Sequence, residues 1–390
     1  MQTSLHTFPH CPFKPEDLLG RAPVVLDLQN AAEEIRDRHI LITGAAGTIG
    51  TGLAAHVCAY APAKVILVDQ AETALFELDH RLREQFPLTD ICSQVASITD
   101  ALRMARLFSQ TRIHIVFHAA AYKHVPFMEL HPYEAIKTNI LGTEILADLA
   151  VSYRVSKFIY ISTDKAVRPA SVMGATKRFA ELYLQYLSHE YPGKTQFIIT
   201  RFGNVLGSNG SFLIRFAEQI REGGPLTVTH PLAERYLMTV TEACQLVLQA
   251  AAGSGGAEIW SVDMGEPVRI ADIARKMIRL AGFEPGKDIQ VRFTGLRPGE
   301  KLTEEINGEA TPAAFGQLRK VRFPSHADSC MRYGMSALQK ALDSGSAEQM
   351  VSVLKMAIPE YHSAHSPYEK LDQAHMRREH WQPVEFRTDT

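Results

Sequence analysis

The segment that most constrains the fold is the glycine-rich turn at residues 44–50, Gly-Ala-Ala-Gly-Thr-Ile-Gly. A short apolar stretch, 39–43, precedes it, and a helical pattern follows it. Glycines at these spacings let the backbone turn tightly and approach a pyrophosphate at a helix N-terminus. A second apolar stretch, 64–68, ends at Asp69, where a carboxylate can meet a ribose 2′-hydroxyl. The pattern predicts a dinucleotide-binding unit. It favours NAD over NADP, because Asp69 would repel a 2′-phosphate.

Apolar stretches and helical patterns continue to alternate along the chain, which is typical of an α/β fold with a parallel sheet. The further strands that we expect lie at residues 91–98, 113–118, 157–161, 196–200 and 259–263. The helices that we expect lie at residues 72–86, 132–152, 174–191, 212–221, 242–252 and 270–281, with more helix from about 330. We therefore predict a Rossmann-type, doubly wound parallel sheet with a smaller α/β substrate-binding domain.

The same pattern divides the chain into regions. We expect an N-terminal arm at 1–38, an NAD-binding Rossmann domain at 39–202 with a return segment at 257–282, a smaller substrate-binding domain at 203–256 and 283–325, and a C-terminal helical extension and tail at 326–390.

The composition argues against several classes of function. The chain has 390 residues, 46% of them hydrophobic, and a net charge of −2, so it lacks the basic footprint of a nucleic-acid-binding protein. No apolar run reaches the roughly 18–20 residues of a membrane span, and residues 1–20 lack a signal-peptide pattern. The five cysteines are scattered without a Cys-x-x-Cys spacing. We therefore expect no metal site and a reduced, cytoplasmic environment.

A polar run, Ser-Thr-Asp-Lys at residues 162–165, follows the apolar stretch 157–161. Ligands of a doubly wound sheet bind just beyond the carboxyl ends of its strands, so this run would lie beside a substrate. Adjacent carboxyl and amine groups suit acid and base roles, because burial and mutual charge can shift their pKa values.

A second lysine, Lys177, lies in the helical pattern that follows, four residues beyond Met173, so the two would share a helix face. Residues 161–178 resemble the catalytic segment of extended short-chain dehydrogenases, in which a Tyr and a Lys four residues later act on a sugar or alcohol. Here Met173 stands at the Tyr position, and a thioether cannot exchange a proton.

One branch of that superfamily shows the same pattern as this chain, Ser-Thr-Asp-Lys-Ala followed by Met-Gly-Ala-Thr-Lys-Arg. This branch is the nucleotide-sugar 4,6-dehydratases of bacterial polysaccharide and glycoprotein synthesis. The resemblance covers roughly residues 12–325. The chain resembles the catalytic domain of the long, membrane-anchored members, made as a free soluble protein.

The resemblance implies which residues hold a tightly bound NAD. The glycine turn would cradle the pyrophosphate, and the alanines after the strand 113–118 would let the cofactor pass close to the backbone. Ser97 stands where the family usually has an Asp that touches adenine. The residues that we expect at the cofactor are Gly44, Gly47, Thr48, Ile49, Gly50, Asp69, Ser97, Ile98, Ala119, Ala120, Ala121 and Lys177.

The resemblance also implies nucleotide-sugar contacts, some of them in the family signature Leu-Arg-Pro-Gly-Glu-Lys-Leu at 296–302. Asn204 and Arg235 would lie near phosphate, and Glu300 would hold a ribose hydroxyl. Asn139 would support the active-site lysine. The residues that we expect at the substrate are Lys123, His124, Asn204, Thr227, Arg235, Arg297 and Glu300.

The reaction implied is the removal of water from UDP-N-acetylglucosamine to give a 4-keto-6-deoxy sugar that keeps its C5 configuration. Asp164 would be the acid at C6 and Lys165 the base at C5, while Lys177 would orient the nicotinamide ribose. With Met173 in place of Tyr, the C4 proton would leave through Thr163 and Asp164.

Three alternatives remain open at this point: a GDP-linked substrate, a nucleotide-sugar 4-epimerase, and a non-catalytic NAD or sugar-nucleotide sensor. The helices at 132–152 and 174–191 resemble the pair by which this superfamily dimerises, so we expect a homodimer or a higher homo-oligomer.

Overall fold

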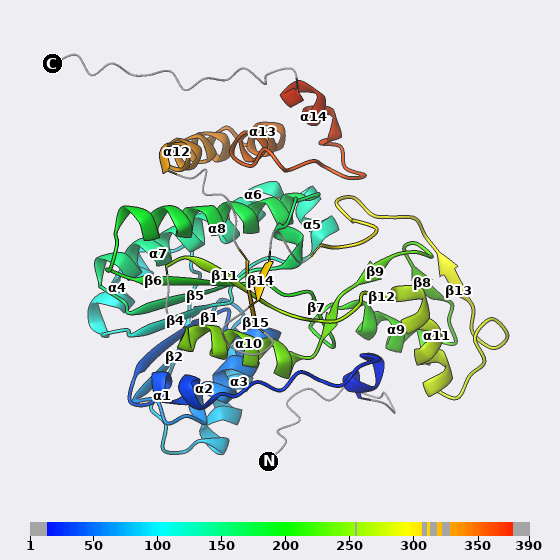
Figure 1. Cartoon of the computed structure of the whole chain (residues 1–390), viewed down its shortest axis with the longest axis horizontal. Helices are drawn as coiled ribbons and strands as arrows, with labels where there is room; N and C mark the ends of the chain where they lie inside the picture. The colour runs from blue at the N-terminus through cyan, green and yellow to red at the C-terminus, as the bar shows by residue number, and fades with distance from the viewer. Residues whose placement is uncertain (1–13, 254–255, 306–309, 313–317, 322–327, 377–390) are drawn as a thin grey trace.

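The computed structural model describes residues 14–253, 256–305, 310–312, 318–321 and 328–376. A nine-stranded sheet lies between two layers of helices, with a smaller lobe beside it and a further pair of helices above one layer (Figure 1). The strands of the sheet are β1 (His39–Thr43), β2 (Lys64–Asp69), β3 (Ile91–Val95), β4 (Ile115–His118), β5 (Lys157–Ile161), β6 (Gln196–Thr200), β11 (Glu258–Val262), β14 (Ala310–Pro312) and β15 (Leu318–Val321).

The strand order is β14-β15-β11-β6-β5-β4-β1-β2-β3. The seven strands from β3 to β11 are parallel, and β3-β2-β1-β4-β5-β6 is the Rossmann order. The predicted fold class is therefore confirmed. Apart from the edge strand β3, the parallel strands are buried on both faces, and their side chains alternate: Leu41 joins one core cluster, whereas Ile40 and Ile42 join the other.

Helices cover both faces of the sheet (Figure 1). The first face carries α4 (Ala101–Gln110), α5 (Val125–Leu130), α6 (Pro132–Ile136), α7 (Gly142–Ser152) and α8 (Val172–Glu190). The second carries α1 (Gln29–Ile35), α2 (Thr48–Cys58), α3 (Glu72–Gln85) and α10 (Val240–Ala252). Between β5 and α8 the chain forms a short 3₁₀ turn, η3 (Asp164–Ala166).

The predicted helix at 132–152 is interrupted by a π-helical turn, η2 (Lys137–Leu141), between α6 and α7. Such turns often occur at functional sites. Here the turn presents Asn139, whose Oδ1 atom accepts a hydrogen bond from the Tyr122 amide at 2.8 Å. Its Nδ2 atom donates to Thr176 Oγ1 at 3.0 Å. Asn139 therefore links the segment after β4 to Thr176 of α8, the residue before Lys177.

The smaller lobe has its own core. It contains η1 (Pro15–Leu18), β8 (Leu226–Val228), β13 (Val291–Phe293), α9 (Phe212–Arg221) and α11 (Ile270–Leu280). The short pairs β7 (Asn204–Val205) with β10 (Leu237–Met238), and β9 (Glu234–Arg235) with β12 (Val268–Arg269), lie between the lobe and the sheet.

Two predicted domain boundaries need correction. Of the return segment 257–282, only β11 joins the large sheet, because α11 buries its apolar face in the smaller lobe. Conversely, β14 and β15 were expected in the smaller domain, yet they form an antiparallel edge of the large sheet next to β11. An amphipathic helix pattern shows which face is buried, but it does not show against which partner.

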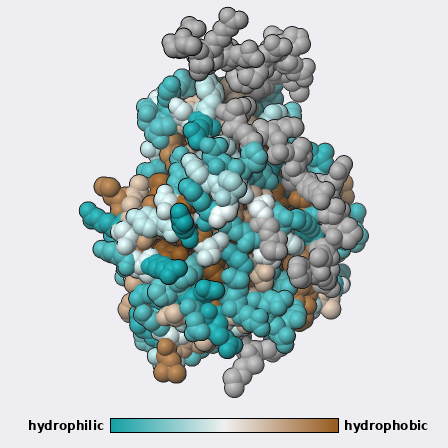
Figure 2. All heavy atoms as spheres, turned by 60° about the vertical axis from the view of Figure 1, so that its left-hand side comes forward, coloured by the Kyte–Doolittle hydropathy of each residue, from teal (hydrophilic) through white to brown (hydrophobic). Residues whose placement is uncertain are grey.

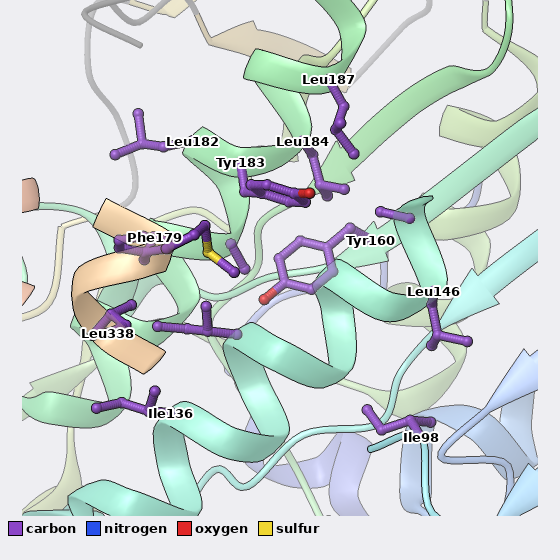
Figure 3. Close-up of a cluster of buried hydrophobic side chains, with 14 of the residues drawn as sticks. Ile98, Ile136, Leu146, Tyr160, Phe179, Leu182, Tyr183, Leu184, Leu187 and Leu338 are labelled. Atoms are coloured by element: carbon purple, nitrogen blue, oxygen red, sulfur yellow. The ribbon is translucent and has the colours of Figure 1, made fainter. Parts of the chain in front are cut away.

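The C-terminal helices α12 (Asp328–Ser344) and α13 (Ala347–Ala357) pack against α8, and α14 (Glu369–Met376) follows them. Phe179 of α8 and Leu338 of α12 belong to one buried cluster (Figure 3). A Cβ atom at Gly334 would lie 3.3 Å from the Phe179 ring. The helix at 174–191, one of the pair predicted to make dimer contacts, therefore packs against the C-terminal helices of its own chain. The sequence did not reveal this, because an apolar helix face looks the same whether its own chain or a second copy covers it.

No helix in the described ranges is long and apolar enough to cross a bilayer. On the face in Figure 2, hydrophilic residues predominate and hydrophobic residues form small, separate groups.

Candidate active site

The glycine turn lies between β1 and α2, and close backbone approach explains two of its glycines. Gly44 has a φ of +65°, and a Cβ atom there would lie 2.5 Å from the backbone nitrogen of Ala120. A Cβ atom at Gly50 would lie 2.1 Å from the carbonyl oxygen of Gly44. A side chain at either position would force the backbone to move. The turn therefore packs directly on the alanine segment after β4.

Asp69 ends β2 beside this turn. Its Oδ2 atom accepts a hydrogen bond from the Ala46 amide at 3.0 Å, and its Oδ1 atom accepts one from the Ala71 amide at 2.9 Å. A Cβ atom at Gly47 would meet only the Gly44 carbonyl within 4 Å. An open turn at a helix N-terminus, with a fixed carboxylate beside it, fits a dinucleotide whose ribose hydroxyls donate to Asp69.

The remaining cofactor candidates differ in what their side chains offer. Thr48 is 8% exposed, and its Oγ1 atom accepts from the Asn209 amide at 3.1 Å. Ile98 is 5% exposed and packs in the core against α7, so only its backbone could face a cofactor. Ser97 bonds within its own turn. Ile49 and the alanines at 119–121 are half-buried.

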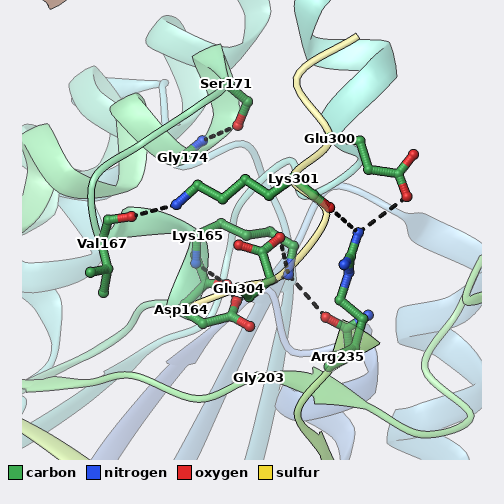
Figure 4. A network of polar contacts seen from close by, with 12 residues as sticks. Asp164, Lys165, Val167, Ser171, Gly174, Gly203, Arg235, Glu300, Lys301 and Glu304 are labelled. Carbon is green, nitrogen blue, oxygen red and sulfur yellow. Dashed lines mark hydrogen bonds and ion pairs between the residues drawn. The ribbon is translucent and has the colours of Figure 1, made fainter. Parts of the chain in front are cut away.

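Asp164 and Lys165 meet at the carboxyl end of β5 (Figure 4). Oδ1 of the fully buried Asp164 accepts from Thr163 Oγ1 at 2.8 Å and from Lys165 Nζ at 3.0 Å. Lys165 Nζ also donates to Asn204 Oδ1 at 2.9 Å. Burial disfavours the charged form of Lys165, but Asp164 and Glu304 outweigh it and raise the pKa of Lys165. The predicted acid–base pair is thus brought together with a predicted substrate residue.

Glu304 is a member of this cluster that the sequence did not predict. Its Oε1 atom lies 3.8 Å from Lys165 Nζ, and the residue is 4% exposed. Burial raises the pKa of Glu304; the charge of Lys165 opposes that shift and the charge of Asp164 adds to it. Only the nearby signature at 296–302 could have drawn attention to Glu304, because nothing local ties it to Lys165.

Lys177 lies one helical turn after Met173 in α8, and its ammonium group is buried. The Nζ atom donates to the carbonyl oxygen of Ile161 at 2.7 Å and lies 4.3 Å from the centre of the Tyr160 ring. Burial lowers the pKa of Lys177 to about 7, although the charge of Glu181 opposes the shift. Near neutral pH, Lys177 can therefore exist in either protonation state.

The side chain of Met173, the residue that the resemblance aligns with a Tyr, lies in the hydrophobic core. The residue is 1% exposed and belongs to the same buried cluster as Phe179. It therefore contributes packing at this position, and any proton transfer must use other groups.

The signature segment is held by an arginine from β9. Arg235, 6% exposed, donates to the carbonyl oxygens of Lys301 and Leu302 at 2.9 and 3.1 Å, and to Glu300 Oε1 at 3.1 Å. We expected Arg235 near phosphate, whereas here its guanidinium group fixes the segment. The Arg297 side chain is 60% exposed and contacts Glu300 at 3.2 Å, so Arg297 is the arginine that can reach an anion.

The other expected substrate residues lie in two places. Desolvation and the charge of Lys165 lower the pKa of Lys123. Burial, with the charges of Lys123 and Arg297, lowers the pKa of His124. Positive charges of the site therefore disfavour the protonated form of both Lys123 and His124. Thr227 is tied within the smaller lobe, where its Oγ1 atom accepts from Gln219 Nε2 at 2.8 Å.

Comparison with known proteins gives a family match. The model of the family described as "Polysaccharide biosynthesis protein" matches residues 40–321. The capsular polysaccharide biosynthesis protein CapD of Staphylococcus aureus is 46% identical over 292 residues, which are 75% of this chain and 48% of CapD. The chain thus spans about half the length of that relative. A UDP-glucose 4-epimerase of Rickettsia massiliae is 32% identical over 73% of this chain and 81% of the epimerase.

Solved structures agree with the fold. Pen from Bacillus thuringiensis is 30% identical, with a TM-score of 0.69 over 75% of this chain and 90% of Pen. DesIV, a dTDP-glucose 4,6-dehydratase of Streptomyces venezuelae solved with NAD bound, is 21% identical, with a TM-score of 0.60 over 69% of this chain and 88% of DesIV.

Proposed function

Because this chain belongs to the polysaccharide biosynthesis protein family, we propose that it catalyses the NAD-dependent 4,6-dehydration of a nucleotide-linked N-acetylhexosamine. The substrate we propose is UDP-N-acetylglucosamine, and the product is UDP-2-acetamido-2,6-dideoxy-4-keto-hexose with its C5 configuration retained. The observation that carries the proposal is the buried Asp164, bonded to Lys165 at 3.0 Å at the carboxyl end of β5. A 4-epimerase leaves the 6-hydroxyl in place, so its reaction needs no acid–base pair at C5 and C6.

The residues would act in sequence. The C4 hydroxyl proton would pass through Thr163 to Asp164, whose Oδ1 atom lies 2.8 Å from the Thr163 hydroxyl. Once Asp164 is neutral, Lys165 would release its ammonium proton to solvent and then take the C5 proton, which the ketone at C4 makes more acidic. Asp164 would give its proton to the departing C6 hydroxyl, which leaves as water. Lys165 would finally return a proton to C5 and regain its ammonium proton from solvent as Asp164 ionises again, so the protons balance.

The cofactor fits the residues at the first two strands. Bound NAD would supply the reversible hydride acceptor that oxidation at C4 and reduction at C6 require. The turn at 44–50 would bind the pyrophosphate through its amides, and Asp69 would accept from the adenosine ribose. Lys177, held by the Ile161 carbonyl at 2.7 Å, would orient the nicotinamide ribose.

The alternatives make different products. The relatives named as 4-epimerases keep a 4-epimerase in view, and such an enzyme would invert C4 and leave the 6-hydroxyl in place. A sensor would bind without turnover. A GDP-linked substrate would give the same chemistry with another base.

The test is proton NMR of the purified protein with UDP-N-acetylglucosamine in D₂O, without added cofactor. The expected result is a new C6 methyl signal with deuterium at C5. Inversion at C4 with the 6-hydroxyl retained would instead support the epimerase. If the spectrum does not change, NAD and then GDP-N-acetylglucosamine are added. If no C6 methyl signal appears although NAD is bound, the dehydratase proposal is refuted.

A further inference from the structure

Glu304 lies beside the Asp164–Lys165 pair, although the proposed reaction does not use it. Its Oε1 atom is 3.8 Å from Lys165 Nζ, while its Oε2 atom has no hydrogen-bond partner among the described residues. Asp164 shows the same asymmetry. Its Oδ1 atom accepts two hydrogen bonds, whereas its buried Oδ2 atom has no hydrogen-bond partner among the residues that the structure describes. Two buried carboxyl groups therefore share one ammonium group (Figure 4).

The charges around Glu304 come from three places. Asp164 and Lys165 face it from η3, Arg235 from β9, and Lys301 from its own segment. Arg235 is engaged with the segment 300–302.

The charges of Arg235 and Lys301 favour the ionised form of Glu304, but burial and the charge of Asp164 outweigh them and raise its pKa. Lys301 Nζ donates to the Val167 carbonyl at 2.9 Å. Glu305, the next residue, turns away to pair with Arg168. With both carboxyls ionised, Asp164 and Glu304 would each bury an oxygen that has no hydrogen-bond partner among the described residues while sharing one ammonium group, which is costly.

We propose that Glu304 is a positioning residue that keeps one proton beside the Asp164–Lys165 pair, so that Lys165 faces one counter-charge rather than two. This inference rests on the proposed dehydration. When Asp164 takes up the C4 proton, a neutral Glu304 leaves Lys165 with no adjacent carboxylate. Lys165, whose side chain is 19% exposed, can then release its proton to solvent and regain it when Asp164 ionises again. An ionised Glu304 would hold Lys165 as an ammonium group, unable to accept the C5 proton. The proton on Glu304 is not consumed.

The test compares Glu304→Gln with the neighbouring control Glu305→Gln. Gln has the shape of a protonated Glu, so Glu304→Gln should lower turnover by less than about tenfold at neutral pH, well short of the loss on removing a catalytic acid or base. The wild type and Glu305→Gln should lose turnover on the alkaline side as Glu304 ionises, and Glu304→Gln should lack that decline. A loss of about a hundredfold at every pH, or a profile that superimposes on the control, would overturn the proposal.

Infrared difference spectra supply a readout that does not depend on activity. At neutral pH, the wild type and Glu305→Gln should show a carbonyl band of a protonated carboxyl group that Glu304→Gln lacks. If this band is present but no dehydration occurs, the proposed function fails and the proton-holding role stands. If no such difference is found, the role is refuted whatever the activity. Should Glu304→Gln not fold, Glu304→Asp is expected to shift the same band, and an unshifted band would count against the role.

Discussion

The Nζ atom of Lys165, at the end of β5, lies 2.9 Å from Oδ1 of Asn204 on β7, outside the large sheet. The base proposed for C5 is thus held from both sides of the site, by Asp164 in the same turn and by Asn204 from the segment that leads to the smaller lobe. This arrangement makes Lys165 the first residue to test.

Replacing Lys165 with Ala should abolish dehydration and deuterium incorporation at C5 while sparing NAD binding, because the glycine turn and Asp69 lie on other strands. The measurements are the proton NMR assay and the NAD content of the purified protein. Lys194→Ala, at an exposed lysine beside Tyr191, is the control and should behave as the wild type. Dehydration that persists in Lys165→Ala would remove Lys165 from the mechanism.

Replacing Gly44 with Ala should lower NAD content and the free energy of unfolding, because the new Cβ atom would lie 2.5 Å from Ala120 N. Gly193 is a matched control, since it also has a positive φ, +76°, but nothing within 4 Å. Gly193→Ala should lower the free energy of unfolding only by the cost of a left-handed backbone conformation, about 1–2 kcal/mol, and should leave NAD bound. Equal effects of the two substitutions on NAD content would contradict the close-approach explanation.

Replacing Met173 with Leu should leave C5 exchange intact and cost less than about 1.5 kcal/mol, because the swap conserves volume in a packed core. Met173→Ala should cost about 2–5 kcal/mol. Urea unfolding and the NMR assay give the two readouts. Loss of exchange in Met173→Leu, at unchanged stability, would mean that the sulfur atom takes part in the chemistry.

Lys177 should make stability depend on pH. Its pKa falls from 10.5 to about 7 on folding, so between these values the unfolded chain binds a proton that the native protein does not. The free energy of unfolding should therefore rise with pH in that window, by about 1.4 kcal/mol per pH unit; the gain is complete above pH 10.5 and fully lost once the pH has fallen to about 7. Comparing urea unfolding of the wild type and Lys177→Met from about pH 7 to about pH 9 isolates this term. Parallel curves would show that Lys177 has an ordinary pKa.

The parts of the fold that follow local rules could be predicted from the sequence. The Gly44 turn, Asp69 at the end of β2, and the adjacent Asp164 and Lys165 are fixed by short spacings, and the parallel sheet follows from the alternation of strands and helices. The resemblance to a known family added roles for these residues, which the assays above have yet to test.

The features that the sequence did not reveal depend on contacts between distant segments. Arg235 meets the 300–302 segment, and Glu304 meets Lys165, across long stretches of chain. The cover of α12 and α13 on α8 is of the same kind, since an apolar face does not specify its partner. The π turn at 137–141 could not be foreseen, because its residues read as ordinary helix.

The segment that carries Glu300, Lys301 and Glu304 is clasped by Arg235 on one side and reaches Lys165 and the Val167 carbonyl on the other. Because this one segment makes both sets of contacts, a displacement of residues 300–304 would separate Glu304 from Lys165 and free the Arg235 guanidinium group at the same time. The hold of Arg235 on the segment therefore also fixes where Glu304 lies beside the proposed base.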